Sequence, residues 1–208
     1  GVWYRKLTGT TVGSVIQLAG DDAFDPRMAV AGSNIYVLWR NVGGGISLRR
    51  STDAGETFLP AVQLTGEGVT EIDVSVAGAD VFVAWRATGA TGPLRLAVSH
   101  NDGITFGAPS TIAGPAATTP RLAFAGGKLF AAWLAPALSG GGSDLLVAVS
   151  GDGGASFGGT QRLATGLRSA RPIIAANSAR AFFVWNALVN DGSADTFVAR
   201  TVDCGEPQ

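Results

Sequence analysis

Six charged residues occupy corresponding places in the chain, each at the start of a short apolar segment. Three are arginines and three are acids: Asp25, Arg27, Glu71, Asp73, Arg121 and Arg171. The planar guanidinium of arginine can donate two parallel hydrogen bonds to a carboxylate, so converging arginines suit a polar or acidic ligand. Acids at the same level can equally pair with the arginines. The residue types therefore allow either a ligand-binding site or a set of internal ion pairs.

The apolar segments that must position these charges are each followed by a strand-like sequence that returns four times. Each copy carries one tryptophan, and the copies are Ile35–Arg40, Val81–Arg86, Leu129–Leu134 and Ala181–Asn186. The tryptophans Trp39, Trp85, Trp133 and Trp185 lie 46, 48 and 52 residues apart. A nearly continuous apolar strand is typical of burial on both faces. We therefore expect the tryptophans to pack between sheets rather than to form a sugar-binding platform.

A second repeated sequence combines a hydroxyl residue, an acid or amide, a glycine and an aromatic residue. Its acid or amide is Asp53, Asn101, Asp152 or Asp203, at spacings of 48, 51 and 51 residues. Such side chains bond to nearby backbone N–H groups, and glycine accepts a positive φ, so each copy predicts a locked hairpin with a structural role. The residues assigned to these hairpins are Ser51, Asp53, Gly55, Thr57, Phe58, Ser99, Asn101, Gly103, Thr105, Phe106, Ser150, Asp152, Gly154, Ser156, Phe157, Thr201, Asp203 and Gly205.

Both repeats predict the same architecture. Each unit of roughly 48 residues holds an apolar first strand, the tryptophan strand, a third strand, the locked turn and a fourth strand. Four short strands per unit form the blade of a β-propeller. We predict an all-β propeller of about four four-stranded blades in one domain. Its units are 1–18 (a partial blade), 19–66, 67–113 and 114–164 (complete), and 165–208 (lacking its last strand).

The N-terminal segment departs from this pattern. Residues Gly1–Leu18 align with Ser47–Leu64, so they supply a third and a fourth strand only. The chain then has 17 strands, whereas four closed blades need 16. We expect Val15–Leu18 to close the last blade, because closure removes sheet edges. The surplus strand could instead complete a neighbouring copy and build a fibre or open array, and its residues are Val2, Trp3, Tyr4, Arg5 and Lys6.

The composition limits the class of protein. Hydrophobic residues make up 46% of the 208 residues, which is enough for a core, and the 30 glycines fit many turns. The net charge of -1 argues against a surface for nucleic acid or anionic membranes. A single cysteine, Cys204, excludes an intrachain disulfide. Because the chain begins at Gly1, we expect a mature, processed or excised product. The longest apolar run, Leu129–Leu138, is too short to span a bilayer, and we expect an extracellular or cell-surface protein.

The Ser-x-Asp-x-Gly-x-Thr-aromatic turn, repeated after a Tyr/Phe-x-x-Trp strand, resembles the Asp-box repeat of bacterial neuraminidases (sialidases) and their many non-catalytic relatives. The resemblance covers essentially the whole chain and implies a β-propeller. It also implies that the Asp boxes lie on the outer rim, far from any active site. There they would stabilise the hairpin between the third and fourth strands.

Catalysis by sialidases implies three arginines around a carboxylate, a Tyr/Glu nucleophilic pair and an acidic proton donor. The Phe/Tyr-Arg-Ile-Pro motif of that family is absent, although Asp25–Met28 is a distant echo of it. Tyr36 aligns with core phenylalanines, and Tyr4 lies in the surplus strand. Sialidase propellers also have six blades, which need a longer chain. We therefore expect no catalytic residues, and a sialidase-like hydrolase is the less favoured alternative.

The expected function is binding or scaffolding. The six charged residues at the central mouth of the propeller predict a site for a glycan or a protein ligand, because variable loops on a rigid scaffold suit recognition. No cofactor and no metal are expected, since His100 has no histidine or cysteine beside it and is predicted to be a solvated turn residue. Self-assembly through the surplus strand is the structural alternative.

Overall fold

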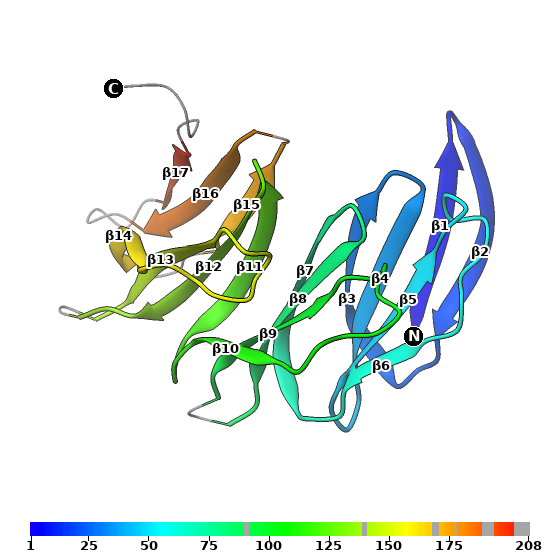
Figure 1. The fold of residues 1–208 in the computed structure, drawn as a ribbon, viewed down its shortest axis with the longest axis horizontal. Helices are drawn as coiled ribbons and strands as arrows, with labels where there is room; N and C mark the ends of the chain where they lie inside the picture. The colour runs from blue at the N-terminus through cyan, green and yellow to red at the C-terminus, as the bar shows by residue number, and fades with distance from the viewer. Residues whose placement is uncertain (90–91, 139–140, 168–170, 178, 189–193, 202–208) are drawn as a thin grey trace.

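A computed structural model describes residues 1–89, 92–138, 141–167, 171–177, 179–188 and 194–201. These residues form seventeen β-strands in five antiparallel sheets (Figure 1). The predicted all-β propeller of about four blades is confirmed, because the sheets have a four-bladed β-propeller arrangement. Among the described residues, no helix has the length and apolar character needed to cross a membrane.

Three sheets are complete four-stranded blades, and each is built from strands that follow one another in the chain. The first blade comprises β3 (Ala23–Ala31), β4 (Asn34–Asn41), β5 (Ile46–Ser51) and β6 (Val62–Thr65). The second comprises β7 (Val69–Ala77), β8 (Asp80–Ala87), β9 (Leu94–Ser99) and β10 (Ser110–Ala113). The third comprises β11 (Thr118–Ala125), β12 (Lys128–Pro136), β13 (Ser143–Ser150) and β14 (Gln161–Leu167).

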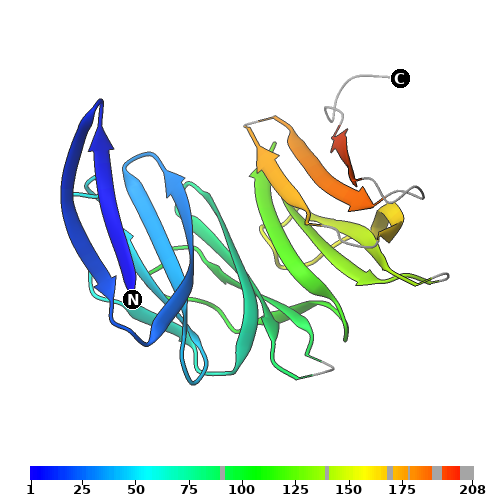
Figure 2. The same ribbon diagram turned by 180° about the vertical axis from the view of Figure 1, so that it is seen from behind.

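The remaining two sheets lie at opposite ends of the molecule (Figures 1 and 2). The fourth blade has three described strands: β15 (Ile173–Ala176), β16 (Ala181–Leu188) and β17 (Ala194–Arg200). The N-terminal sheet has two strands, β1 (Val2–Thr8) and β2 (Thr11–Ala19). The first strands of the four blades, β3, β7, β11 and β15, all contribute residues to one open depression of about 210 Å³ and therefore mark the propeller axis.

The expectation that Val15–Leu18 closes the last blade is wrong. This segment is part of β2, and β2 pairs with β1 across a two-residue turn that joins Thr8 to Thr11. Gly9 in that turn has φ 59°, a conformation that glycine adopts without strain. Closing a short hairpin loses far less chain entropy than bringing the two ends of the propeller together. The local partner therefore takes the strand, and no described strand pairs with the outer edge of β17.

The hydrophobic core is divided among the joints between neighbouring sheets, and each joint holds one of the repeated tryptophans. Trp85 is fully buried against Tyr36, Leu38 and Leu48 of the preceding blade. The joint beneath Trp39 contains Val2 and Leu18 of the N-terminal sheet. Trp133 and Trp185 occupy the following two joints. Because these indoles lie inside the joints, their packing positions each blade relative to the next.

Candidate functional site

The first strands of the three complete blades are irregular at the end where the charged residues lie. The pairing shifts between Phe24 and Arg27 in β3, between Val69 and Glu71 in β7, and between Thr118 and Arg121 in β11. Such β-bulges redirect side chains and occur often beside functional sites. We call this end of the first strands, where the charged residues lie, the mouth of the propeller.

Both of these bulges contain a residue in the left-handed region, followed by proline and arginine. Asp25 has φ 53° and Thr119 has φ 55°. Non-glycine residues in this region store roughly 1–3 kcal/mol of strain and are concentrated at binding and catalytic sites. The same strained turn thus precedes Arg27 and Arg121 in two different blades.

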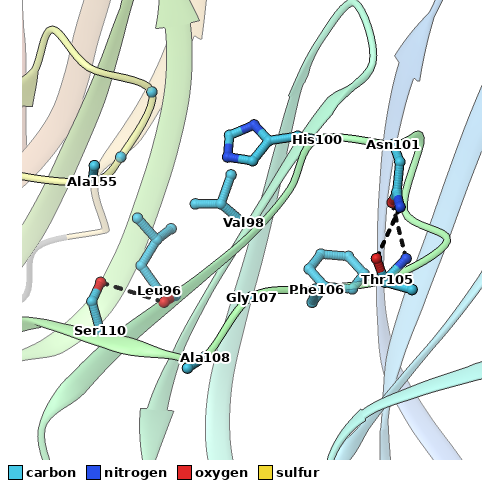
Figure 3. A pocket seen from close by; sticks show the side chains of 12 residues that line it. Leu96, Val98, His100, Asn101, Thr105, Phe106, Gly107, Ala108, Ser110 and Ala155 are labelled. Atoms are coloured by element: carbon cyan, nitrogen blue, oxygen red, sulfur yellow. Dashed lines mark hydrogen bonds between the residues drawn. The ribbon is translucent and has the colours of Figure 1, made fainter.

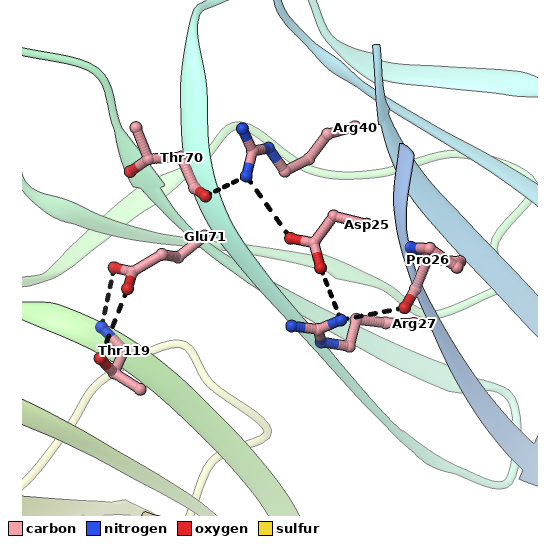
Figure 4. Close-up of polar contacts among 7 residues, drawn as sticks. All are labelled: Asp25, Pro26, Arg27, Arg40, Thr70, Glu71 and Thr119. Atoms are coloured by element: carbon pink, nitrogen blue, oxygen red, sulfur yellow. Dashed lines mark hydrogen bonds and ion pairs between the residues drawn. The ribbon is translucent and has the colours of Figure 1, made fainter. Parts of the chain in front are cut away.

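The guanidinium of Arg27 is held by its own turn. Its Nη1 donates to Asp25 Oδ1 at 2.8 Å and to the carbonyl of Pro26 at 3.0 Å (Figure 4). Asp25 Oδ2 lies 3.5 Å from Nη1 of Arg40, and Arg40 also donates to the carbonyl of Thr70 in the next blade. Arg27 is 35% exposed, and its Nε and Nη2 make no hydrogen bond with the described residues. Donors of a fixed guanidinium therefore remain free at the mouth.

Arg121 is held in the same way. Its Nη1 donates to the carbonyl of Pro120 at 2.7 Å, as Arg27 does to Pro26. Its Nε donates to the carbonyl of Pro172 in the fourth blade at 3.0 Å. Among the residues that the structure describes, Nη2 of Arg121 has no hydrogen-bond partner. The two arginines are thus fixed by equivalent backbone carbonyls.

Asp73 occupies the corresponding place in the blade between them. Its Oδ2 accepts a hydrogen bond from the backbone N–H of Leu122 at 2.7 Å. Burial raises the pKa of this carboxyl, while the Leu122 N–H and the charges of Arg121 and Arg27 act in the opposite direction. Desolvation penalises the charged form and so outweighs the attraction of the two cations.

The other two charged residues predicted at the mouth, Glu71 and Arg171, have different surroundings. Glu71 spans a joint: Oε2 accepts from the Thr119 N–H at 2.8 Å, and Oε1 lies 3.4 Å from the Thr119 hydroxyl (Figure 4). Arg171 is exposed, and its backbone N–H donates to Asn186 Oδ1 at 3.2 Å. No hydrogen bond or ion pair joins the Arg171 side chain to the other five in the described part of the chain. Sequence reasoning missed Arg40, although its recurrence as Arg86 after the next tryptophan was a usable signal.

The Asp-box turns are internally bonded and lie between third and fourth strands. In the first turn, Ser51 Oγ donates to Asp53 Oδ1 at 2.7 Å and accepts from the Gly55 N–H at 2.9 Å. Asp53 Oδ1 also accepts from the Thr57 N–H at 2.9 Å. The second and third turns repeat these bonds around Asn101 and Asp152.

The fourth copy of the turn is described only at its first residue. The backbone N–H of Thr201 donates to the carbonyl of Ala181 at 3.0 Å. Asp203, Cys204 and Gly205 lie outside the described residues. Within the described residues, no group of three or more His, Cys, Asp or Glu side chains could hold a metal ion.

Comparison with solved structures shows the fold alone. A Hadza microbial sialidase, Hz136, superposes with a TM-score of 0.60 at 17% identity, over 84% of this chain and 43% of that one. A PL25 ulvan lyase bound to -[GlcA(1-4)Rha3S]- has a TM-score of 0.62 at 11% identity, over 88% and 53%. An exo-1,5-alpha-L-arabinanase from a bovine ruminal metagenomic library has a TM-score of 0.57 at 11% identity, over 86% and 74%.

The chain therefore spans less than half of the sialidase and about half of the lyase. No family model and no curated protein matches it. The chain is a β-propeller structurally similar to sialidase, arabinanase and lyase propellers.

Proposed function

We propose that the chain is a non-enzymatic, extracellular binding module whose mouth holds an acidic glycan. The observation that carries the proposal is the matched pair of arginines, Arg27 and Arg121. Each is fixed on the carbonyl of the preceding proline, and each keeps at least one N–H donor free. A fixed guanidinium binds a carboxylate with little further loss of conformational freedom.

The charge around the two arginines supports an anionic ligand. Asp25 is already paired with Arg27 and Arg40, and Glu71 is bonded to Thr119. The raised pKa of Asp73 weakens its competition with an incoming carboxylate. The ulvan lyase, which is bound to a ligand containing glucuronic acid, gives a fold-level analogy for an acidic sugar at such a propeller.

The positions of the two tyrosines support binding without turnover. The Tyr4 ring packs edge-on against Phe58 at 4.9 Å, and the Tyr36 hydroxyl donates to Asp102 Oδ1 at 3.2 Å. Burial raises the pKa of Tyr36, which disfavours the phenolate needed for nucleophilic attack. Both tyrosines are thus committed to joints between sheets.

A hydrolase is the second candidate, and Asp73 is the observation that favours it. A desolvated carboxyl with a raised pKa can donate a proton, and such groups are frequent in active sites. Its oxygen bonded to Leu122 argues for a structural role instead.

The binding proposal is tested by calorimetric titration with a methyl glucuronoside and the matched methyl glucoside. We expect binding of the glucuronoside alone, weakened by added salt and reduced about tenfold or more in both Arg27→Ala and Arg121→Ala. Arg5→Ala, which removes an exposed cation of the N-terminal sheet, serves as the matched control and should bind normally. Equal binding of the two glycosides would contradict the proposal.

Turnover is tested separately with a fluorogenic sialoside and a fluorogenic glucuronide. We expect no release of fluorophore above the buffer rate. Release that disappears in Asp73→Asn would replace the binding module with the hydrolase.

A further inference from the structure

Equivalent grooves lie beneath the hairpins at the outer rim, where the Asp box of one blade meets the third strand of the blade before it. The groove between the first and second blades has a volume of about 240 Å³ and is lined by Arg50, Leu59, Pro60 and Ile104, among others. The groove between the second and third blades has a volume of about 490 Å³ (Figure 3). The repeat allows the two to be compared position by position.

Large and polar side chains fill the first of these grooves. Arg50 Nη1 donates to the carbonyl of Asp102 in the facing Asp box at 3.1 Å. Asp102 Oδ1 in turn accepts from Asn34 Nδ2 and from the Tyr36 hydroxyl, each at 3.2 Å. The joint is therefore closed by bonds between the two blades.

The second groove lacks every one of these groups. Val98 stands at the place of Arg50, Gly153 at that of Asp102, and Phe82 at that of Tyr36. Two further positions are smaller, because Gly107 replaces Leu59 and Ala155 replaces Ile104. The extra volume thus follows from particular substitutions within the repeat, and the groove falls within the roughly 300–1,000 Å³ of small-molecule sites.

A histidine stands at the edge of this open groove, and its ring is bonded to an aspartate outside the lining. Asp80 occupies the place that Asn34 has in the first blade. The residue that faces it in the next blade is Gly153, which has no side chain to accept or donate a bond. Asp80 Oδ1 instead lies 2.8 Å from His100 Nδ1 of its own blade. The His100 ring reaches across the opening, since a Cβ placed on Gly153 would lie 4.0 Å from Cε1 of His100. The carboxylate accepts from Nδ1–H, so Nε2 is left to face the solvent, and it has no hydrogen-bond partner among the described residues.

We propose that this groove binds one neutral sugar residue. Leu96, Val98 and Phe106 give it an apolar floor, and His100, Asn101 and Ser110 supply polar groups at its edge. None of the lining residues is Asp, Glu, Lys or Arg, so nothing in the groove compensates a charged ligand. A pyranose ring, with its C–H face and its hydroxyls, matches an apolar floor bordered by an imidazole, an amide and a hydroxyl. The site is separate from the mouth and does not rest on the function proposed for it.

The test is a ¹H–¹⁵N NMR titration of the full chain with methyl glucopyranoside, methyl galactopyranoside and methyl mannopyranoside. We expect saturable shifts of the Val98, His100 and Ala155 amides for at least one of them. The dissociation constant should be about 1 mM, as expected for a ligand of roughly a dozen non-hydrogen atoms. A Gly107→Leu, Ala155→Ile double variant fills the groove with the residues that the chain itself carries at Leu59 and Ile104. It should bind at least tenfold more weakly.

A second variant keeps the test independent of how the filled groove packs. His100→Ala removes an exposed ring and should retain the spectrum of the folded chain while weakening binding about tenfold. Absence of saturable shifts in the unmodified chain would overturn the proposal. Shifts that persist unchanged in the filled variant or in His100→Ala would overturn it as well. Arg27→Ala should leave these shifts intact, which separates this site from the mouth.

Discussion

The carboxylates of the Asp boxes are held ionised by uncharged neighbours. Asp152 accepts hydrogen bonds from the Ser150 hydroxyl and from both the N–H and the hydroxyl of Ser156. These bonds lower its pKa from the usual 3.8 to about 2, with the Ser156 hydroxyl as the largest cause. Because hydrogen bonds to the charged form favour that form, the turn is tighter when the acid is ionised.

Replacement of Asp152 by asparagine tests this charge. The folded pKa lies below the unfolded one, so the unfolded chain binds more protons between about pH 4 and pH 2. The stability that Asp152 contributes is therefore present above pH 4 and lost as the pH falls toward 2. Asp152→Asn should lower the melting temperature slightly at pH 7 and reduce the further loss between pH 4 and pH 2.

Thermal melts at pH 7, 4, 3 and 2 would measure both effects. Asn101→Asp is the reciprocal variant, because the second box already carries an asparagine with equivalent hydrogen bonds. It should gain the acid dependence that Asp152→Asn loses. Identical pH profiles for the two variants would contradict the assignment.

The first strands of successive blades are joined by polar side chains, in addition to the tryptophans in the joints. Asp73 on β7 reaches the Leu122 N–H of β11, and Glu71 on the same strand reaches Thr119. Arg121 on β11 continues the series to Pro172 beside β15. A bulged first strand therefore presents charges that bond across to the next blade.

Variants of Asp73 separate its hydrogen bond from its charge. Asp73→Asn keeps an acceptor for the Leu122 N–H and removes the need to bury a charge, so the melting temperature at pH 7 should stay equal or rise. Asp73→Ala leaves that N–H without a partner, which costs about 1–3 kcal/mol. For a chain of this size, we expect a fall of about 2–12 °C by differential scanning calorimetry. A larger loss in the asparagine variant than in the alanine variant would show that the charge itself stabilises the joint.

The sequence predicts the elements better than it predicts the site. Repeat spacing and the apolar tryptophan strands are enough to predict the sheets, because a short segment that is buried on both faces has few alternatives to a central β-strand. The bulges that redirect Arg27 and Arg121 depend on the φ of Asp25 and Thr119, which no local pattern specifies. The cross-blade bonds of Glu71 and Asp73 likewise depend on how two blades pack. Among the described residues, the one ion pair between two of the six charges joins Asp25 and Arg27.

At the scale of the whole molecule, the N-terminal hairpin acts as a cover for the first blade. Val2 and Leu18 are buried on its inner face together with Ile35, Val37 and Trp39. Its outer face leaves Trp3 59% exposed. Assembly through strand exchange would require β1 to leave this packing, so the surplus strand has a role within its own chain.

Deletion of residues 1–19 tests the cover. The deletion exposes the apolar surface of Ile35, Val37 and Trp39, whose burial contributes on the order of 5 kcal/mol to the free energy of unfolding. The melting temperature should fall by about 10 °C or more, or the protein should aggregate. Trp3→Ala removes an exposed ring from the same hairpin and should melt within about 2 °C of the unmodified chain. An unchanged melting curve after the deletion would contradict the role of the hairpin.

The order of strands has a consequence for how the chain acquires its structure during synthesis. Every sheet consists of strands that follow one another, and the N-terminal hairpin pairs only with itself. Each sheet can therefore form soon after its last strand leaves the ribosome, and the preceding sheet offers it an apolar surface on which to pack. Contacts between residues distant in sequence arise mainly between successive blades. Each new blade therefore packs on the blade made just before it, and only a short stretch of chain has to be closed each time.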